Sequence, residues 1–236
     1  MPNFIEGEVI LVDKPLTWTS FDAVNKLKHL LKRSTGLKKI KVGHAGTLDP
    51  LASGLLIICT GKKTKTIEGI QGQQKEYTGI IELGATTASY DLETELENFK
   101  DSSSISEEDI FSVARKMEGE VDQIPPIFSA KKINGKRAYD LARAGQTPEM
   151  KTKRIQIYSF KIEKIEMPEV HFRIACSRGT YIRSIAHDFG NYLSVGGYLK
   201  ALRRTKIGNF QVENAIKVEA FEELASQHHV ELTAQQ

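Results

Sequence analysis

The stretch Gly43-His44-Ala45-Gly46-Thr47-Leu48-Asp49-Pro50-Leu51-Ala52-Ser53-Gly54 lies between two apolar runs, residues 9–12 before it and 55–59 after it. Its three glycines allow positive φ angles or a close approach of the backbone to another group. Pro50 fixes the chain directly after Asp49 and disfavours helical geometry for that aspartate. The stretch therefore predicts a stiff loop, anchored to buried elements, that presents a carboxylate. Catalytic residues are often supported in this way.

The elements around this loop predict an α+β protein. Alternating apolar residues and helix signals occur without a strict βαβ rhythm, which favours a mixed or antiparallel central sheet. Strands are expected over residues 8–13, 55–59, 75–83, 154–165, 170–176, 198–205 and 207–212. Helices are expected from Thr19 or Ser20 to about Arg33, and over residues 64–70, 106–117, 138–144, 181–193 and 218–225. A surface loop is expected over residues 93–104. The chain is expected to form a single domain over residues 1–236.

Three details of these helices are specific enough to test. Phe21, Val24, Leu27 and Leu31 would form the inward stripe of the first helix. Ser106 with Asp109 forms a capping-box pattern. Thr180 is in position to cap the helix that starts at Tyr181.

Positive charge is concentrated in two regions of a nearly neutral chain. The net charge is +3, yet residues 26–41 contain seven lysines or arginines and no acidic residue, and residues 131–154 form a second basic stretch. Such regions are typical of a face that meets a polyanion, and equally of ordinary solvated surface.

The cysteines and the N-terminus indicate a cytoplasmic protein. Cys59 and Cys176 each lie in an apolar run with no second cysteine nearby, so neither a disulfide framework nor a zinc site is expected. No basic and apolar leader is visible, and no apolar run is long enough to cross a bilayer.

Asp49 is the first candidate for chemistry. An Asp-Pro pair is also a common turn, but His44 and Thr47 lie within the same loop. One carboxylate on a rigid loop can act as a nucleophile at an electrophilic carbon. The loop supplies no second acid, which argues against glycoside hydrolysis.

Three further residues have two readings each. Arg183 follows the Gly179-Thr180-Tyr181 turn and would either lie at the surface or pair with an acid. Tyr77 would be an aromatic at the edge of the core, or would stack on a base and shuttle a proton. His44 would be a hydrogen-bonded structural group or part of a site.

Taken in order, these segments resemble the bacterial tRNA pseudouridine synthase B family. The matching segments are Asp13-Lys14-Pro15 with Thr19-Ser20, residues 43–54, Lys75-Glu76-Tyr77, Leu83-Gly84 with Thr87 and Asp91, residues 123–132, residues 176–183, and Leu202-Arg203-Arg204-Thr205. They extend from about residue 7 to residue 212. Because these motifs occur together and in register, the resemblance is specific.

The resemblance implies a pseudouridine synthase fold and an activity. The enzyme would isomerise uridine 55 in the T-loop of tRNA by flipping out the base, cleaving the C–N glycosidic bond and reattaching uracil through C5. Attack at the sugar, attack at the base and a glycal route all remain open. The resemblance also implies no metal or organic cofactor, and tRNA bound through its T-arm. No membrane association and no obligate protein partner are expected, and a monomer is expected, although the sequence itself carries no signal for oligomeric state.

The resemblance also assigns roles to residues. Asp49 would be the nucleophile, Tyr77 would stack on the base and take the C5 proton, and Arg183 would pair with Asp49. His44 would help to extrude the base, Asp91 would contact the turned base, and Leu202 would line the pocket. The substrate-binding set would comprise His44, Thr47, Asp91, Tyr181, Leu202, Lys14 and Lys132.

The resemblance leaves one departure and two alternatives. Many members of the family carry an additional C-terminal RNA-binding domain, which is not expected here, while an RNA-binding insertion is expected around residues 130–155. We therefore expect recognition to rest on the T-arm. The same chemistry on another RNA is the first alternative. An RNA-binding or RNA-folding module is the second, and the set of Asp49, Tyr77 and Arg183 argues against it.

Overall fold

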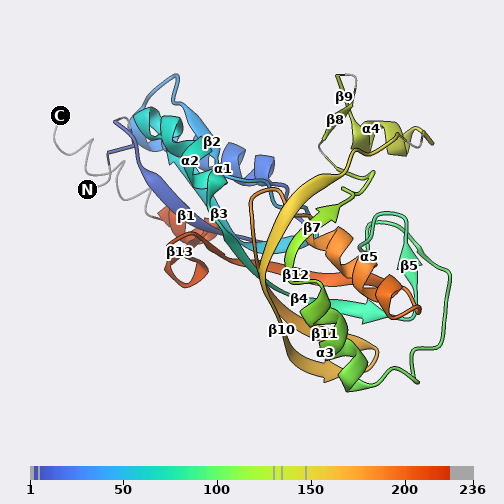
Figure 1. Cartoon of the computed structure of the whole chain (residues 1–236). Helices are drawn as coiled ribbons and strands as arrows, with labels where there is room; N and C mark the ends of the chain where they lie inside the picture. The colour runs from blue at the N-terminus through green and yellow to red at the C-terminus, as the bar shows by residue number, and fades with distance from the viewer. Residues whose placement is uncertain (1–2, 5, 130, 134, 147, 224–236) are drawn as a thin grey trace. The chain divides into compact units, whose positions relative to one another are not determined.

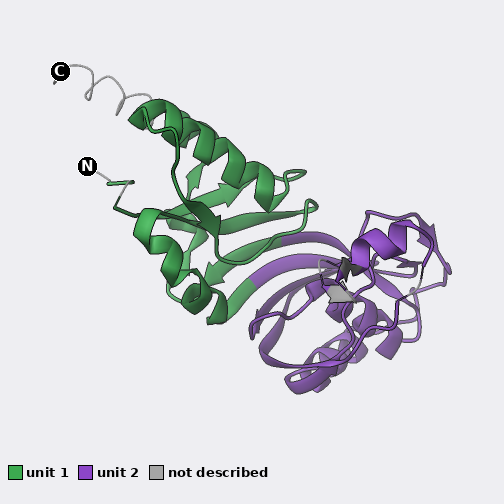
Figure 2. Ribbon diagram, turned by 90° about the horizontal axis from the view of Figure 1, so that it is seen from above, with its two compact units in different colours: residues 1–76, 203–236 green, residues 77–202 purple. Residues whose placement is uncertain are grey.

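The computed structural model describes residues 3–4, 6–129, 131–133, 135–146 and 148–223. The chain divides into two compact units (Figure 2). Unit 1 comprises residues 1–76 and 203–236, and unit 2 comprises residues 77–202. The strands β4 (Lys75–Leu83) and β12 (Gly197–Ile207) each contain one of the two points where the chain passes from one unit to the other.

Unit 1 contains the N-terminal and C-terminal elements (Figure 1). Its elements, apart from its parts of β4 and β12, are β1 (Val9–Lys14), α1 (Ser20–Thr35), β2 (Val42–His44), β3 (Ala52–Thr60), the 3-10 helix η1 (Gly61–Thr66), α2 (Ile67–Gly72), β13 (Phe210–Gln211), the 3-10 helix η2 (Val212–Asn214) and β14 (Ile216–Lys217). Residues 218–223 are helical, and the rest of the last predicted helix lies outside the described residues.

The sheet of unit 1 is mixed. β3 pairs antiparallel with β1, with Leu56 opposite Val12, and also antiparallel with β2. β1 pairs parallel with β14. Successive residues of β3 point to opposite faces of the sheet. Leu56 and Ile58 accordingly pack with α1, whereas Leu55 and Ile57 pack in a second cluster that includes Ile70 of α2.

The inward face of α1 differs from the predicted stripe at one residue. Val24, Leu27 and Leu31 are buried as expected, but Phe21 is 68% exposed. Ala23 and Leu30 are buried in its place. At 100° per residue, position 21 lies about 120° around the helix from position 27, which is the centre of the buried face. The prediction for Phe21 was therefore wrong, while Thr19 caps the helix in a capping box with Asp22.

Unit 2 is built on long antiparallel strands. Its elements are the main part of β4 and of β12, with β5 (Thr86–Thr87), β6 (Leu96–Glu97), α3 (Glu107–Lys116), β7 (Gly119–Gln123), β8 (Lys132–Ile133), β9 (Lys136–Arg137), α4 (Ala138–Arg143), β10 (Lys153–Glu166), β11 (Glu169–Cys176) and α5 (Ile182–Tyr192). Its strand order is β12-β4-β11-β10-β7. The predicted antiparallel pairing of β10 with β11 is confirmed.

An aromatic cluster forms part of the core of unit 2. Phe160 of β10 contacts Phe172 of β11 edge to face, with ring centroids 5.9 Å apart, and lies 5.5 Å from the ring of Phe189 on α5. The cluster ties α5 to the sheet. Because Arg183 lies on the same helix, the packing of the aromatic rings also determines where the arginine is held.

The two predicted caps in unit 2 have different outcomes. Ser106 and Asp109 form the expected capping box of α3. Thr180 does not cap α5, since the residue preceding the helix is Tyr181, which makes no side-chain cap. The Thr180 hydroxyl instead donates to the carbonyl of Ser177 at 3.0 Å. It closes the turn before the helix and is too early in the chain to reach the helical amides.

The class predicted from the sequence, α+β with a mixed sheet and flanking helices, is confirmed. Among the residues that the structure describes, no helix combines the length and the apolar character that crossing a bilayer requires.

Candidate active site

Residues 43–54, here called the Asp49 loop, comprise the end of β2, the connection that carries Asp49 and the start of β3, and a buried arginine holds their backbone. Arg204 of β12 is 1% exposed. Its guanidinium donates to the carbonyls of Gly46 at 3.0 Å, Thr47 at 3.3 Å and Leu55 at 2.8 Å. A fork of donors that binds three carbonyls fixes the backbone on both sides of Asp49. The predicted stiff loop is therefore explained mainly by a residue about 150 positions away in the sequence.

Hydrogen bonds to Ser20, the first residue of α1, and to Thr17, which precedes the helix, also anchor the loop. The Oγ of Ser20, which is 3% exposed, accepts from the amide of Leu48 at 2.8 Å and donates to its carbonyl at 3.1 Å. The amide of Thr17 donates to the carbonyl of Pro50 at 2.8 Å. The residues directly before and after Asp49 are therefore both bonded to the segment that leads into α1.

Gly54 allows the loop to lie against β12. Its φ is +101°, and a Cβ at this position would lie 2.4 Å from the carbonyl oxygen of Arg204. A side chain would collide with backbone rather than with a mobile group, so glycine is required both for conformation and for space.

Lys14 is a buried cation close to the Asp49 loop. It is 0% exposed, and its Nζ donates to the carbonyls of Pro15 at 2.9 Å and Trp18 at 2.5 Å. Burial lowers the pKa of Lys14 to about 8, and the negative charge of Asp49 acts in the opposite direction. Lys14, predicted to bind substrate, therefore also supports the turn beside the loop and interacts electrostatically with Asp49.

The other predicted residues of this loop differ in exposure. Thr47 is exposed, and its carbonyl accepts from Arg204. His44 is partly buried, and burial lowers its pKa, while a hydrogen bond with the backbone of Gly46 opposes that shift. Neutral imidazole is therefore favoured at neutral pH.

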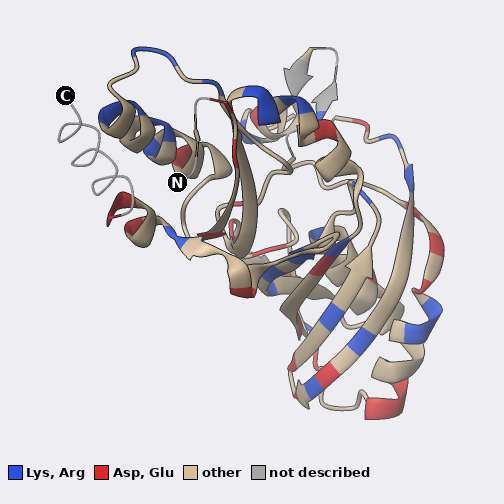
Figure 3. Cartoon of the chain, turned by 90° about the vertical axis from the view of Figure 1, so that its left-hand side faces the viewer, with Lys and Arg blue, Asp and Glu red and all other residues tan. Residues whose placement is uncertain are grey.

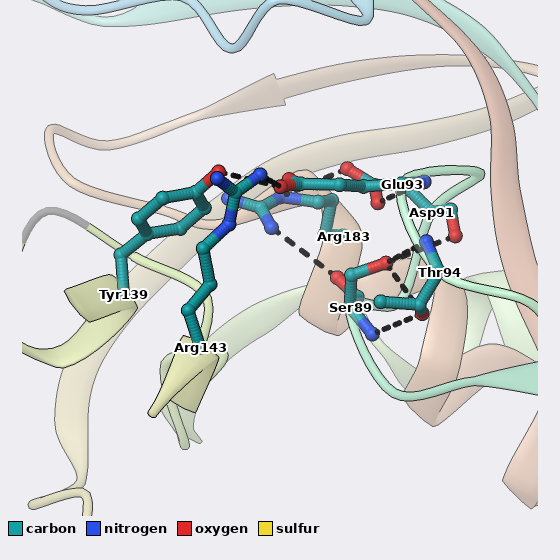
Figure 4. A network of polar contacts seen from close by, with 7 residues as sticks. All are labelled: Ser89, Asp91, Glu93, Thr94, Tyr139, Arg143 and Arg183. Carbon is teal, nitrogen blue, oxygen red and sulfur yellow. Dashed lines mark hydrogen bonds and ion pairs between the residues drawn. The ribbon is translucent and has the colours of Figure 1, made fainter. Parts of the chain in front are cut away.

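In unit 2, Asp91 and Arg183 form a buried ion pair (Figure 4). Arg183 Nε lies 3.6 Å from Asp91 Oδ2, and the two side chains are 5% and 6% exposed. Arg183 also donates to the carbonyl of Ser89 at 3.2 Å. Both residues were predicted to belong to the site, but the sequence did not predict that they pair with each other. The expected pairing of Arg183 with Asp49 stays a prediction.

The turn that carries Asp91, residues 87–94 and here called the Asp91 turn, is held by hydroxyl groups. Thr87 and Ser89 donate to the carbonyl of Asp91 at 2.7 and 3.1 Å. The amide of Glu93 donates to Asp91 Oδ1 at 3.0 Å. The carboxylate is thus bonded on one oxygen by the backbone and faces the guanidinium with the other. This geometry fixes the carboxylate in a single orientation.

A stacked pair of rings lies beside the same turn. The ring of His187, one helical turn after Arg183 on α5, stacks on Tyr90 with centroids 3.9 Å apart. Tyr90 has a φ of +65°, which is uncommon for a residue with a side chain. Burial lowers the pKa of His187, so the neutral ring is favoured. α5 therefore contacts the Asp91 turn through two side chains on one face.

The segment before α5 is clamped by a glutamine. Gln123 Oε1 accepts from the amide of Tyr181 at 2.8 Å, and its Nε2 donates to the carbonyl of the same residue at 3.0 Å. Ser184 donates to the carbonyl of Ile124 at 2.8 Å. The first residues of the 123–132 motif thus dock on the start of α5, a role that the sequence alone did not reveal.

The remaining predicted residues lie on three strands. Tyr77 begins the unit 2 part of β4 and is 8% exposed, and Leu202 of β12 is partly buried. Lys132 lies in β8, and its side chain lies outside the described part of the chain. Sequence reasoning missed the roles of Ser20, Tyr90, His187 and Arg204. Ser20 and Arg204 lie in matched motifs, but no local signal marks which residues they contact.

Family models match the chain in two consecutive parts. The TruB family pseudouridylate synthase (N terminal domain) model matches residues 32–182, and the tRNA pseudouridylate synthase B C-terminal domain model matches residues 183–234. Two similar proteins are named tRNA pseudouridine synthase B. The one from Flavobacterium johnsoniae is 55% identical over 94% of this chain and 97% of its own length. The one from Phocaeicola vulgatus is 48% identical over 97% of both chains.

Solved structures with a similar fold are longer than this chain. A chain in a crystal structure of a Cbf5-Nop10-Gar1 complex matches with a TM-score of 0.71 and 30% identity, over 93% of this chain and 54% of its own. A chain in the structure of an H/ACA RNP bound to a substrate RNA containing 2′-deoxyuridine matches with a TM-score of 0.67 and 28% identity, over 92% and 53%. This chain spans about half the length of either.

Proposed function

Because the chain belongs to the TruB family of pseudouridylate synthases, we propose that it isomerises uridine 55 in the T-loop of tRNA to pseudouridine. The observation that carries this proposal is the similarity, over nearly the full length of both chains, to proteins named tRNA pseudouridine synthase B. The anchoring of the Asp49 loop by Arg204 and Ser20 supports it, because a nucleophile needs a defined position relative to the bond that breaks.

In the proposed reaction, the bond between N1 of uracil and C1′ of ribose breaks and a new bond joins C5 to C1′. The proton on C5 is lost and N1 gains a proton, so substrate and product are isomers. A base inside folded RNA cannot be reached by a side chain and must first be flipped out, at a cost of a few kcal/mol. Asp49 acts as the nucleophile, which requires its ionised form.

We assign Tyr77 to stacking on the flipped base and to removal of the C5 proton. Arg183 and Asp91 form a fixed polar pair that contacts the turned base. Such a pair is preorganised, so little free energy is spent on orienting it during the reaction. His44 assists extrusion of the base, and its favoured neutral form allows it to lie against an uncharged ring.

The two basic stretches offset the cost of extrusion by contacting phosphates. In unit 1, basic residues are spread over α1 and the segment that follows it (Figure 3), at Lys26, Lys28, Lys32, Arg33, Lys38, Lys39 and Lys41. We expect tRNA affinity to fall steeply as the salt concentration rises. A flat response would mean that these side chains do not contact phosphate.

The test is release of tritium from unmodified tRNA transcript that carries tritium at C5 of uridine. We expect release that stops at one equivalent per tRNA and that disappears in a transcript with cytidine at position 55. The Asp49→Asn variant is the matched negative control. Absence of release from a properly folded transcript would exclude the isomerase. Release from the position 55 variant would instead show that the enzyme modifies uridine at another position or in another RNA.

A further inference from the structure

Glu93 connects two parts of unit 2 that are far apart in the sequence (Figure 4). Its amide donates to the Asp91 carboxylate, which places it inside the Asp91 turn. Its own carboxylate accepts from the hydroxyl of Tyr139 at 2.7 Å and from Arg143 at 3.3 Å. Both partners lie on α4, within the stretch expected to bind RNA.

The hydrogen bond from Tyr139 is the stronger half of this connection. The Arg143 side chain is 65% exposed, and ion pairs at such positions contribute little because water and salt screen them. A hydroxyl that donates to a carboxylate at 2.7 Å is charge-assisted and short. Partial burial and the bond to Glu93 raise the pKa of Tyr139, so the hydroxyl keeps its proton at neutral pH.

Tyr139 is itself held in place by the chain around it. Its amide donates to the carbonyl of Ser129 at 2.9 Å, and its ring contacts Phe128 edge to face with centroids 6.2 Å apart. The guanidinium carbon of Arg143 lies over the same ring, 4.7 Å from its centroid. A ring fixed in this way transmits the position of α4 to the carboxylate that its hydroxyl contacts.

We propose that Glu93 is a positioning residue that couples α4 to the Asp91 turn. The position of α4 then determines how the carboxylate of Asp91 is oriented toward Arg183. The proposal rests on the proposed function in one respect: RNA bound by the basic stretch around α4 acts on the polar pair at the turned base through Glu93. Glu93 itself does not contact the reacting atoms.

A double-mutant cycle on kcat tests the coupling, with pseudouridine formation on tRNA transcript as the readout. Glu93→Ala and Tyr139→Phe are each expected to lower kcat three- to tenfold and to change KM less than twofold. The double variant is expected to be as slow as the slower single variant, because the two residues act through one bond. Glu93→Gln keeps an acceptor oxygen and is expected to retain at least half of the kcat.

Matched controls use the same substitutions at the surface. Glu95→Ala removes an exposed carboxylate two residues further along, and Tyr158→Phe removes the hydroxyl of a tyrosine that is 52% exposed. Both are expected to match the unmodified enzyme. Three outcomes would each overturn the proposal. The effects of the single variants on kcat could multiply in the double variant, KM alone could increase, or kcat could stay unchanged.

Hydrogen exchange provides a readout that needs neither RNA nor activity. In Tyr139→Phe, amide exchange over residues 87–94 is expected to be at least threefold faster, and Tyr158→Phe is expected to leave it unchanged. Exchange that is equally slow in both variants would overturn the coupling even if the enzyme is active. Faster exchange in an enzyme that releases no tritium would refute the proposed function alone. If Glu93→Ala does not fold, Tyr139→Phe, which removes a single oxygen, still decides the question.

Discussion

The Asp49 loop and the Asp91 turn both contain an aspartate and are both held by a buried arginine, but the two arginines act differently. Arg204 contacts the Asp49 loop through backbone carbonyls. Arg183 contacts the Asp91 turn through one carbonyl and the carboxylate itself. The first arrangement positions the loop through its backbone, and the second also contacts the side chain of the aspartate. A carboxylate that reacts suits the first arrangement, and a carboxylate that only orients a substrate suits the second.

Removing the charge of Asp49 should have the largest effect on activity. Asp49→Asn is expected to lower kcat at least about 10³-fold, as loss of a nucleophile does. It should leave tRNA affinity within about tenfold, or 1.4 kcal/mol. Tritium release and filter binding measure the two quantities, with the exposed Asp122→Asn as control. Loss of binding together with activity would show that Asp49 supports the loop and would remove the contrast with Asp91.

The same substitution at Asp91 should act mainly on stability. Asp91→Asn removes a carboxylate that faces the buried guanidinium of Arg183, and we expect the free energy of unfolding to fall by about 3 kcal/mol. Urea denaturation measures the change. Asp49→Asn, measured alongside, is expected to lose less stability, because Arg204 anchors the Asp49 loop through backbone carbonyls. Equal losses at the two positions would contradict the proposed difference between the two arginines.

Replacing Arg204 with lysine tests the backbone anchoring. Lysine keeps the positive charge but cannot present the same fork to three carbonyls, so at least one buried carbonyl loses its donor. We expect Arg204→Lys to destabilise the protein by about 2 kcal/mol in urea denaturation. The neighbouring Arg203 serves as control, because its side chain is 40% exposed where it bonds to Asp13. Arg203→Lys is expected to lower the free energy of unfolding by less than about 1 kcal/mol. Similar losses for both would argue against a special role of Arg204.

The smallest expected effect is a change in the titration of Lys14. Its folded pKa of about 8 lies below its ordinary value of 10.5, and the charge of Asp49 keeps it from falling further. Asp49→Asn should therefore lower the pKa of Lys14 below about 8, which NMR of the lysine side chain can follow. An unchanged pKa would show that the two groups do not interact.

The same titration links Lys14 to stability. As the pH falls from 10.5 towards 8, Lys14 takes up its proton in the unfolded chain before it does so in the folded one. The contribution of Lys14 to stability is therefore present above about pH 10.5 and is lost as the pH falls through about 8. Lys14→Met should remove this part of the pH dependence, as urea denaturation at a series of pH values would show.

Most of the elements could be predicted from the sequence because their signals are local. Period-two alternation over residues 154–165 and 170–176 predicts two strands, and Ser106 with Asp109 predicts a capped helix. The two errors are also local. The predicted inward stripe of α1 included Phe21, which lies beside the buried face. Thr180 was predicted to cap α5, whereas it closes the turn before that helix.

The candidate site could be predicted only in part, because its residues were found by motif and their partners are distant. Asp91 and Arg183 were both singled out, but their ion pair joins positions 92 residues apart, and no periodicity encodes such a contact. Arg204 lies on a strand, where a buried arginine runs against the hydrophobic pattern. Its role becomes visible only when three carbonyls surround its guanidinium. Glu93 lies in a stretch that the sequence identifies merely as an acidic surface loop.

The close approach at Gly54 has a consequence for how this chain can vary. Alanine differs from glycine by one methyl group, yet that group would overlap the main chain of β12, from which Arg204 extends. A saturation library screened for folded protein should therefore recover no substitution at position 54. At position 46 the φ is also positive, but the nearest atom is the end of a flexible guanidinium 3.5 Å away. Substitutions at position 46 should be recovered at reduced frequency. The comparison would distinguish a steric exclusion at position 54 from a conformational cost at position 46.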